Sequence, residues 1–210
     1  YTSILKNNSM RTFTTGVYDY SMYTSVFTDI KSKNGAETLK ATMSSQDWCG
    51  QSFLQLNNRK NKYHLKSFSY FESEGDANST IKKTLLEDEL WNLIRIAPES
   101  IPTGNVELIP SLFFSRLAHE EIKPRQARIS IDKGEAANLT VEYLHLERTV
   151  IIRFEETFPY KILSWAEKSG DDWLAGGSTK ANLKKSIMSA YWTKNGEEYL
   201  GLRDTLELNY

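Results

Sequence analysis

Strand-like segments joined by short turns in residues 37–72 constrain the fold of this chain more than any other feature. Glu37–Ser44 alternates between apolar and polar residues, which is typical of a half-buried strand. Gln51–Leu56 and Lys62–Glu72 follow, and the Asn-rich turn 57–61 lies between them. Such short connections leave no room for a crossover, so the three strands must pair antiparallel.

The rest of the chain repeats this pattern at short spacing. Turn signals occur at 33–35, 132–135 and in the loop 169–180. Pro110 lies inside one strand-like segment, and because proline cannot donate to a sheet ladder, it predicts a sheet edge or a bulge there. The further predicted strands are Val106–Leu117, Gln126–Asp132, Leu139–Leu146, Thr149–Glu156 and Tyr160–Glu167.

One helix is predicted, at Thr84–Ala97. Leucine and isoleucine recur there at helical spacing, and Thr84 with Glu87 matches a capping box. Residues 87–89 place negative charge in the first turn, where the helix dipole favours it, and Pro98 ends the helix.

These elements predict a mainly β fold: a meandering antiparallel sheet of about eight strands, curved into a half-barrel or a lipocalin-like barrel, with the helix across its opening. Residues 1–36 are expected to form an N-terminal arm and entry segment, with a loop at 1–12 and a short helical turn near Tyr20–Val26. Residues 37–210 are expected to form a single antiparallel β domain.

Composition narrows the function classes. The 210 residues carry 26 basic and 27 acidic side chains, a formal net charge of −1, so nucleic acid is not an expected partner. A single cysteine excludes an internal disulfide framework and a cysteine-based zinc cage. No apolar run approaches the roughly 20 residues of a membrane helix. Because the chain starts at Tyr1, a targeting segment is expected to have been removed from its N-terminus.

Motif searches give no support for nucleotide or serine-hydrolase chemistry. The chain lacks a phosphate loop, a dinucleotide fingerprint and a Gly-x-Ser-x-Gly motif, and no cofactor is predicted.

Two groups of residues are candidates for chemistry. Cys49 and His64 lie on neighbouring elements and could act as nucleophile and base, although a lone cysteine is more often an inert small hydrophobe. Glu72, Glu74 and Asp76 offer oxygen ligands for a hard cation, although acidic turns are usually just solvated.

Aromatic residues are the candidates for ligand binding. On the concave face of a curved sheet they could bind a lipid, a glycan or a peptide, and the alternative is that they fill the core. The candidates are Trp48, Phe68, Tyr70, Tyr160 and Trp165.

Several blocks resemble a known family: Thr15–Phe27, Thr38–Asn57, Ser69–Asp76, Leu85–Arg95, Pro102–Ser111 and Phe158–Glu167. Together they are similar to a family of uncharacterised secreted or lipoprotein-type proteins of Bacteroidetes bacteria. Members are often labelled "septum formation inhibitor Maf". Maf proteins carry a Ser-Pro-Arg-Arg loop near the N-terminus, and this chain has none, so the residues do not support that label. The resemblance implies a location in the periplasm or on an outer-membrane anchor, a preceding signal and N-terminal β segment, and no established activity.

Three hypotheses for function follow. The first is a non-enzymatic protein that binds a hydrophobic or amphipathic ligand, or a cell-envelope partner, on a concave sheet face. The second is a hydrolase-like enzyme that uses Cys49 and His64 or the acidic cluster. The third is an assembly module that pairs with a partner strand through a sheet edge near Pro110.

Overall fold

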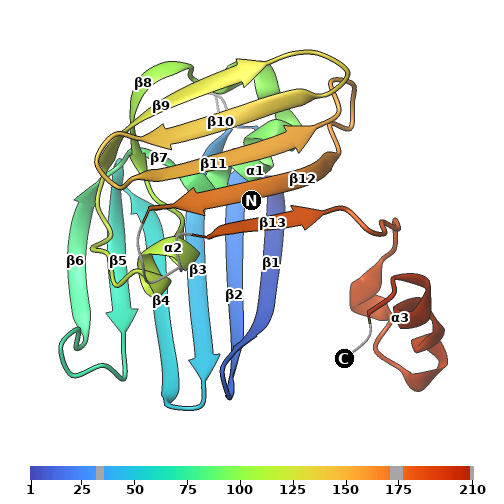
Figure 1. Cartoon of the computed structure of the whole chain (residues 1–210), viewed down its shortest axis with the longest axis horizontal. Helices are drawn as coiled ribbons and strands as arrows, with labels where there is room; N and C mark the ends of the chain where they lie inside the picture. The colour runs from blue at the N-terminus through green and yellow to red at the C-terminus, as the bar shows by residue number, and fades with distance from the viewer. Residues whose placement is uncertain (32–35, 171–176, 209–210) are drawn as a thin grey trace.

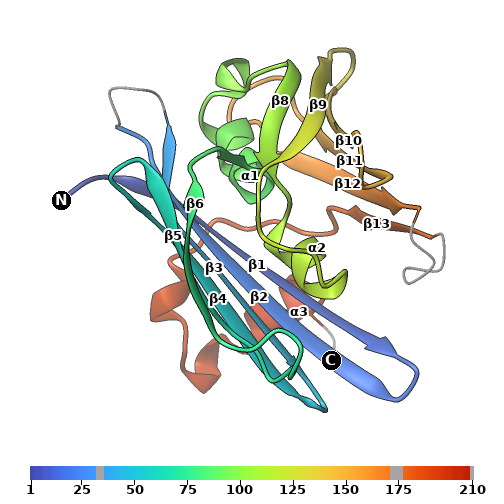
Figure 2. The same cartoon turned by 90° about the vertical axis from the view of Figure 1, so that its left-hand side faces the viewer.

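A computed structural model describes residues 1–31, 36–170 and 177–208 of the chain. The strands form two open sheets, and two helices lie between them (Figures 1 and 2). Within the described ranges, no helix has the length and apolar character needed to cross a membrane.

The first sheet, here called sheet A, is a six-stranded antiparallel meander in sequence order. Its strands are β1 (Ile4–Thr15), β2 (Tyr18–Asp29), β3 (Glu37–Asp47), β4 (Gly50–Arg59), β5 (Lys62–Phe68) and β6 (Ala77–Lys82). Its inner face carries the apolar half of the alternating pattern, including Met43, Leu56 and Tyr63, all fully buried.

The second sheet, sheet B, has the strand order β13-β12-β11-β10-β9-β8-β7. Its strands are β7 (Leu85–Leu86), β8 (Gly104–Ile109), β9 (Arg125–Asp132), β10 (Ala137–Tyr143), β11 (Arg148–Phe154), β12 (Ile162–Ser169) and β13 (Ser178–Asn182). The pair β7 and β8 is parallel, and the other neighbours are antiparallel.

Helices α1 (Glu87–Ile96) and α2 (Leu112–Leu117) lie on the side of sheet A that faces sheet B (Figure 2). Leu90 and Ile94 of α1 join the core of sheet B, whereas Leu112 and Phe113 of α2 join the core of sheet A. The other helices in the described ranges are the 3₁₀ turns η1 (Pro98–Ser100), η3 (Tyr191–Thr193) and η4 (Glu197–Tyr199), and α3 (Gly201–Thr205). The C-terminal segment with α3 extends beyond the β1 edge of sheet A (Figure 1).

The mainly β prediction, with antiparallel meanders and a helix near 84–97, is confirmed, and the strands are divided between two sheets. The helix begins at Glu87, and its N-cap is Leu86, so the predicted capping role of Thr84 is wrong. The backbone amide of Leu86 donates instead to the Glu89 carboxylate at 3.5 Å.

Four local predictions are wrong. Residues 1–12, expected as a loop, contain most of β1, and the helical turn expected near Tyr20–Val26 is part of β2. The sequences of both segments lack a regular alternation of apolar and polar residues. They form strands because they pair with their neighbours in sheet A. Strand β5 ends at Phe68, four residues before the predicted end of its strand.

The fourth error concerns Val106–Leu117. Strand β8 ends at Ile109, and Leu112–Leu117 is a helix whose N-cap is Ser111. Pro110 is buried, and β8 pairs with β7 on one side and β9 on the other, so no sheet edge lies there. The turn predicted at 33–35 and residues 171–176 of the predicted loop 169–180 lie outside the described residues.

Candidate functional site: a polar network beside an inter-sheet cavity

Three consecutive carboxylates at the start of α1 connect three parts of the fold. Glu87, Asp88 and Glu89 are all buried, although acidic side chains usually stay in water. Glu87 reaches sheet B, Asp88 reaches α2, and Glu89 accepts a hydrogen bond from the Thr38 amide of sheet A at 2.7 Å. Burial is the largest cause that raises the pKa of Glu89 above its ordinary value.

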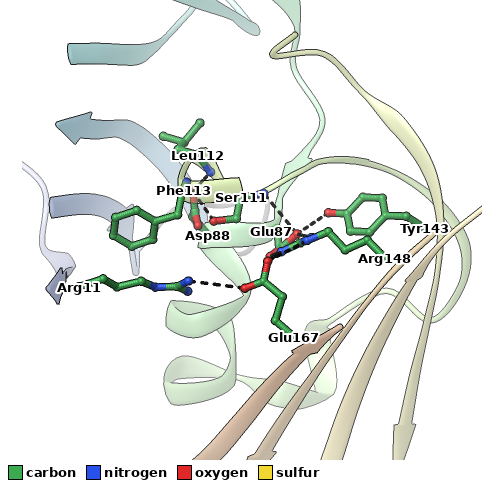
Figure 3. Close-up of polar contacts among 9 residues, drawn as sticks. All are labelled: Arg11, Glu87, Asp88, Ser111, Leu112, Phe113, Tyr143, Arg148 and Glu167. Carbon is green, nitrogen blue, oxygen red and sulfur yellow. Dashed lines mark hydrogen bonds and ion pairs between the residues drawn. The ribbon is translucent and has the colours of Figure 1, made fainter. Parts of the chain in front are cut away.

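Glu87 is held by an ion pair and two further hydrogen bonds (Figure 3). Arg148 Nη2 donates to its Oε1 at 2.7 Å, the Tyr143 hydroxyl donates to Oε2 at 2.6 Å, and the Ser111 amide donates at 3.2 Å. Burial by itself raises the pKa of Glu87, but the Arg148 charge and these hydrogen bonds outweigh it, so the pKa lies below its ordinary value. Glu87 is therefore ionised at neutral pH.

Arg148 joins Glu87 to a second carboxylate. Its guanidinium donates to Glu167 Oε1 from Nε at 2.9 Å and from Nη2 at 2.7 Å, and the ring centroid of Phe114 lies 4.4 Å from it. Glu167 also accepts from Arg11 Nη1 at 3.5 Å (Figure 3). The chain Glu87, Arg148, Glu167, Arg11 thus carries two negative and two positive charges, which balance.

Asp88 adds one further carboxylate to this balanced chain. Its Oδ2 accepts from the Leu112 amide at 2.9 Å, and none of the ion pairs among the described residues involves Asp88. Burial, followed by the charge of Glu87, raises the pKa of Asp88 to about 6. Asp88 can therefore take up a proton in mildly acidic solution.

A cavity of about 300 Å³ lies between the sheets beside this network. Arg11 projects into it from β1, with its guanidinium 4.5 Å from the Phe113 ring centroid and 4.6 Å from that of Trp165. Trp91 of α1 meets Trp165 edge to face at 6.4 Å. Aromatic walls with a few polar groups are typical of small-molecule sites.

Thr24 of β2 also lines the cavity. Thr24 is only 3% exposed, and its hydroxyl has no hydrogen-bond partner among the described residues. A buried hydroxyl without a partner carries a free-energy cost, which a polar ligand group in the cavity would remove.

A larger groove of about 580 Å³ adjoins the cavity, because Trp91 and Asn7 line both. Its walls are mostly apolar, with two cationic residues, Lys6 and Arg95. The apolar residues are Ile4, Leu5, Ile30, Trp91, Ile96, Phe158, Pro159 and Ile162.

The structure brings one of the five predicted aromatic residues to the cavity, namely Trp165. Tyr160 packs against the core of sheet B. Trp48 is 62% exposed in the β3–β4 turn, and Tyr70 donates to Asp47 Oδ2 at 2.9 Å beside that turn. Phe68 is exposed on β5. These residues therefore do not form one site.

Cys49 and His64 are far apart. The thiol of Cys49 is exposed at the start of β4, where it donates to the Tyr18 hydroxyl at 3.3 Å. His64 pairs with Asn57, eight residues further along β4. At about 3.3 Å per strand residue this separation is roughly 26 Å, so the two side chains form no catalytic pair.

The acidic candidates do not converge either. Glu74 accepts from Arg116 Nη1 at 2.6 Å and from the Ser69 hydroxyl at 2.6 Å, and it contacts His119 Nδ1 at 2.6 Å. Glu72 and Asp76 are exposed. In the part of the chain that the structure describes, no three His, Cys, Asp or Glu side chains are placed to hold a metal ion.

Sequence reasoning missed Arg11, Thr24, Asp88 and Arg148. Arg148 lies in the two-residue gap between the predicted strands Leu139–Leu146 and Thr149–Glu156, and Arg11 lies in the predicted loop 1–12. One signal was available: Glu87, Asp88 and Glu89 directly precede the buried leucines of α1, so a helix packed on both sides would bury its first turn.

Comparisons with models of protein families, with curated proteins and with solved structures gave no match.

Proposed function

We propose that this protein binds a small amphipathic molecule in the cavity between its sheets, without transforming it. The observation that carries the proposal is the unpartnered Thr24 hydroxyl in an aromatic cavity that also holds Arg11 and Asp88. A protein interior rarely leaves such a group without a partner, so a ligand with a hydrogen-bonding end fits this position.

The shape of the binding region supports an amphipathic ligand. Its polar end would lie near Thr24, and its apolar body would lie against Trp91, Phe113 and Trp165. A longer apolar chain would continue past Trp91 into the adjoining groove, towards the exposed ring of Phe158. The burial of apolar ligand surface would supply most of the affinity.

Ala181 offers a direct test, because it lines the cavity from edge strand β13. The Ala181→Phe variant places a ring in the cavity, while Lys180→Phe adds the same ring to the opposite face of the same strand. We expect Ala181→Phe to weaken binding of 8-anilinonaphthalene-1-sulfonate, an aromatic anion, by at least about tenfold, since a filled cavity excludes it. Equal affinity in Ala181→Phe and the wild type, measured by probe fluorescence, would contradict the proposal.

Native mass spectrometry of protein purified from its source is the complementary measurement. A co-purifying small molecule in the wild type, absent from Ala181→Phe, is the expected result.

We also propose that the protein acts outside the cytoplasm, in the periplasm or on an outer-membrane anchor. The support is the resemblance of its sequence blocks to secreted and lipoprotein-type proteins. Fractionation of source cells with an antibody to this chain tests it, and recovery in the cytoplasmic fraction would contradict it.

A further inference from the structure

The outer face of sheet A differs in character from the inner face. Met22, Ala41, Leu54 and Leu65 point inward and are buried, so the residues that alternate with them point away from sheet B. Figure 2 shows sheet B, α1 and α2 on the other side of sheet A. Sheet B, α1 and α2 therefore do not cover the outer face, and the C-terminal segment with α3 lies beyond its β1 edge (Figure 1).

The strand register arranges the middle of this outer face in three cross-strand rows. The first row is Lys6, Phe27, Lys40, Asn57, His64 and Thr80. The second row is Asn8, Ser25, Thr42, Gln55, Lys66 and Asn78. The third row is Met10, Tyr23, Ser44, Phe53 and Phe68.

Charge is unbalanced in these rows, although the whole chain has a formal net charge of −1. Three lysines and one histidine occur in these three rows, which carry no carboxylate; the nearest one on β2 is Asp29, two residues beyond Phe27 on the same face. Lys6 on β1 and Lys40 on β3 flank Phe27 of β2 on its two sides. Their Nζ atoms lie 5.1 and 5.9 Å from the ring centroid of Phe27. In sheet B, by contrast, Arg128 lies directly across from Glu142.

Hydrogen-bonding and apolar side chains are also separated into different rows of this face. The middle row is made almost entirely of amides and hydroxyls, which donate and accept hydrogen bonds. The third row exposes apolar surface, with Met10 62%, Phe53 38% and Phe68 49% exposed. In this middle row the Ser25 hydroxyl donates to Asn8 Oδ1 at 2.8 Å. A bilayer would offer no partners to the other amides and hydroxyls of the row, whereas a hydroxyl-rich polymer supplies them.

We propose that the outer face of sheet A binds an acidic polysaccharide. Its carboxylate or sulfate groups pair with Lys6, Lys40 and Lys66, its hydroxyls hydrogen-bond to the amide row, and the apolar faces of its sugar rings stack on Phe53 and Phe68. This surface meets the inter-sheet binding region at β1, where Asn8 and Met10 also line the cavity and Lys6 also lines the adjoining groove. Lys40, Lys66, Phe53 and Phe68 line neither of them, so these residues distinguish the two proposals.

The experiment compares binding of the full chain to polygalacturonate, to neutral dextran, to single-stranded DNA and to vesicles of anionic phospholipid. We expect polygalacturonate to bind at least about tenfold more tightly than dextran, because the cationic row attracts the acidic polymer. Raising the salt from about 0.1 M to about 1 M shortens the screening length from about 10 Å to about 3 Å and should remove most of this preference.

Matched variants locate the surface. The triple variant Lys6→Gln, Lys40→Gln, Lys66→Gln should lose at least about tenfold in polygalacturonate affinity, since it removes three unbalanced charges. The control triple variant removes three exposed cations from β9, from the turn that follows it and from β12: Arg128→Gln, Lys133→Gln, Lys168→Gln. It should bind like the wild type.

The aromatic row has its own readout. Phe68→Ser should weaken polygalacturonate binding without changing its salt dependence, because it removes stacking and no charge. Three results would overturn the proposal: equal losses in both triple variants, no binding of polygalacturonate, or tighter binding of DNA or vesicles than of polygalacturonate. Circular dichroism confirms that each variant is folded.

Discussion

Asp88 should make the stability of this protein depend on pH. Burial and the neighbouring Glu87 charge raise the pKa of Asp88 from 3.8 to about 6 in the folded state. At 1.36 kcal/mol per pKa unit, this difference corresponds to about 3 kcal/mol. The raised pKa means that the folded state binds the proton more tightly than the unfolded state does. The favourable contribution is complete below pH 4 and is lost as the pH rises through about 6.

The Asp88→Asn variant isolates this contribution. Asparagine keeps an acceptor for the Leu112 amide but carries no charge at any pH. The unfolding free energy of Asp88→Asn minus that of the wild type should therefore increase by about 3 kcal/mol between pH 4 and pH 7.5. Urea unfolding followed by tryptophan fluorescence at several pH values measures this difference.

The control variant removes a carboxylate that is exposed to solvent, unlike the buried carboxylate of Asp88. Asp76 is exposed, so the corresponding difference for Asp76→Asn should stay flat over the same pH range. A flat difference for Asp88→Asn as well would refute the reasoning, because it would mean that burial does not disfavour the Asp88 charge.

Other perturbations test the network, the hairpin tip and the lone thiol. Glu87→Gln should destabilise the fold by about 3–5 kcal/mol in urea unfolding at pH 7.5, because it removes one partner of the buried Arg148 ion pair; a loss below 1 kcal/mol would contradict the network. Gly50→Ala should lower the melting temperature, since its Cβ would lie 2.8 Å from the ring of Tyr70, and Tyr70→Ala in the same chain should restore most of the loss. Cys49 should react with a thiol reagent in the native state, and Cys49→Ser should bind the anilinonaphthalene probe like the wild type; a lost affinity would tie the thiol to the site.

Local sequence patterns predicted several elements well, for identifiable reasons. Strands β3 and β4 were found because their apolar and polar residues alternate over a turn-bounded segment. Helix α1 was found because its apolar residues recur at helical spacing. Strands β1 and β2 were missed because their apolar and polar residues do not alternate regularly. They are strands because β2 pairs with β3 and β1 pairs with β2.

The candidate site was less accessible to sequence reasoning. Arg11 and Trp165 are 154 positions apart in numbering, and they meet because β1 and β12 belong to two sheets that face each other. Cys49 and His64 were paired because they are close in sequence, yet β4 runs between them as an extended strand. Proximity along the chain is a poor guide to proximity across a sheet.

The sequence by itself determined the secondary structure wherever one face of an element is apolar, because that periodicity is a local property of the chain. It also determined which residues of β3, β4 and β5 share the outer face of sheet A, since alternating residues of a strand must point to opposite sides. Tertiary structure alone decided the division into two sheets and the burial of Glu87, Asp88 and Arg148. These depend on which distant strands pack against α1, and charged side chains become buried only where such packing supplies a partner of opposite charge or a hydrogen-bond donor.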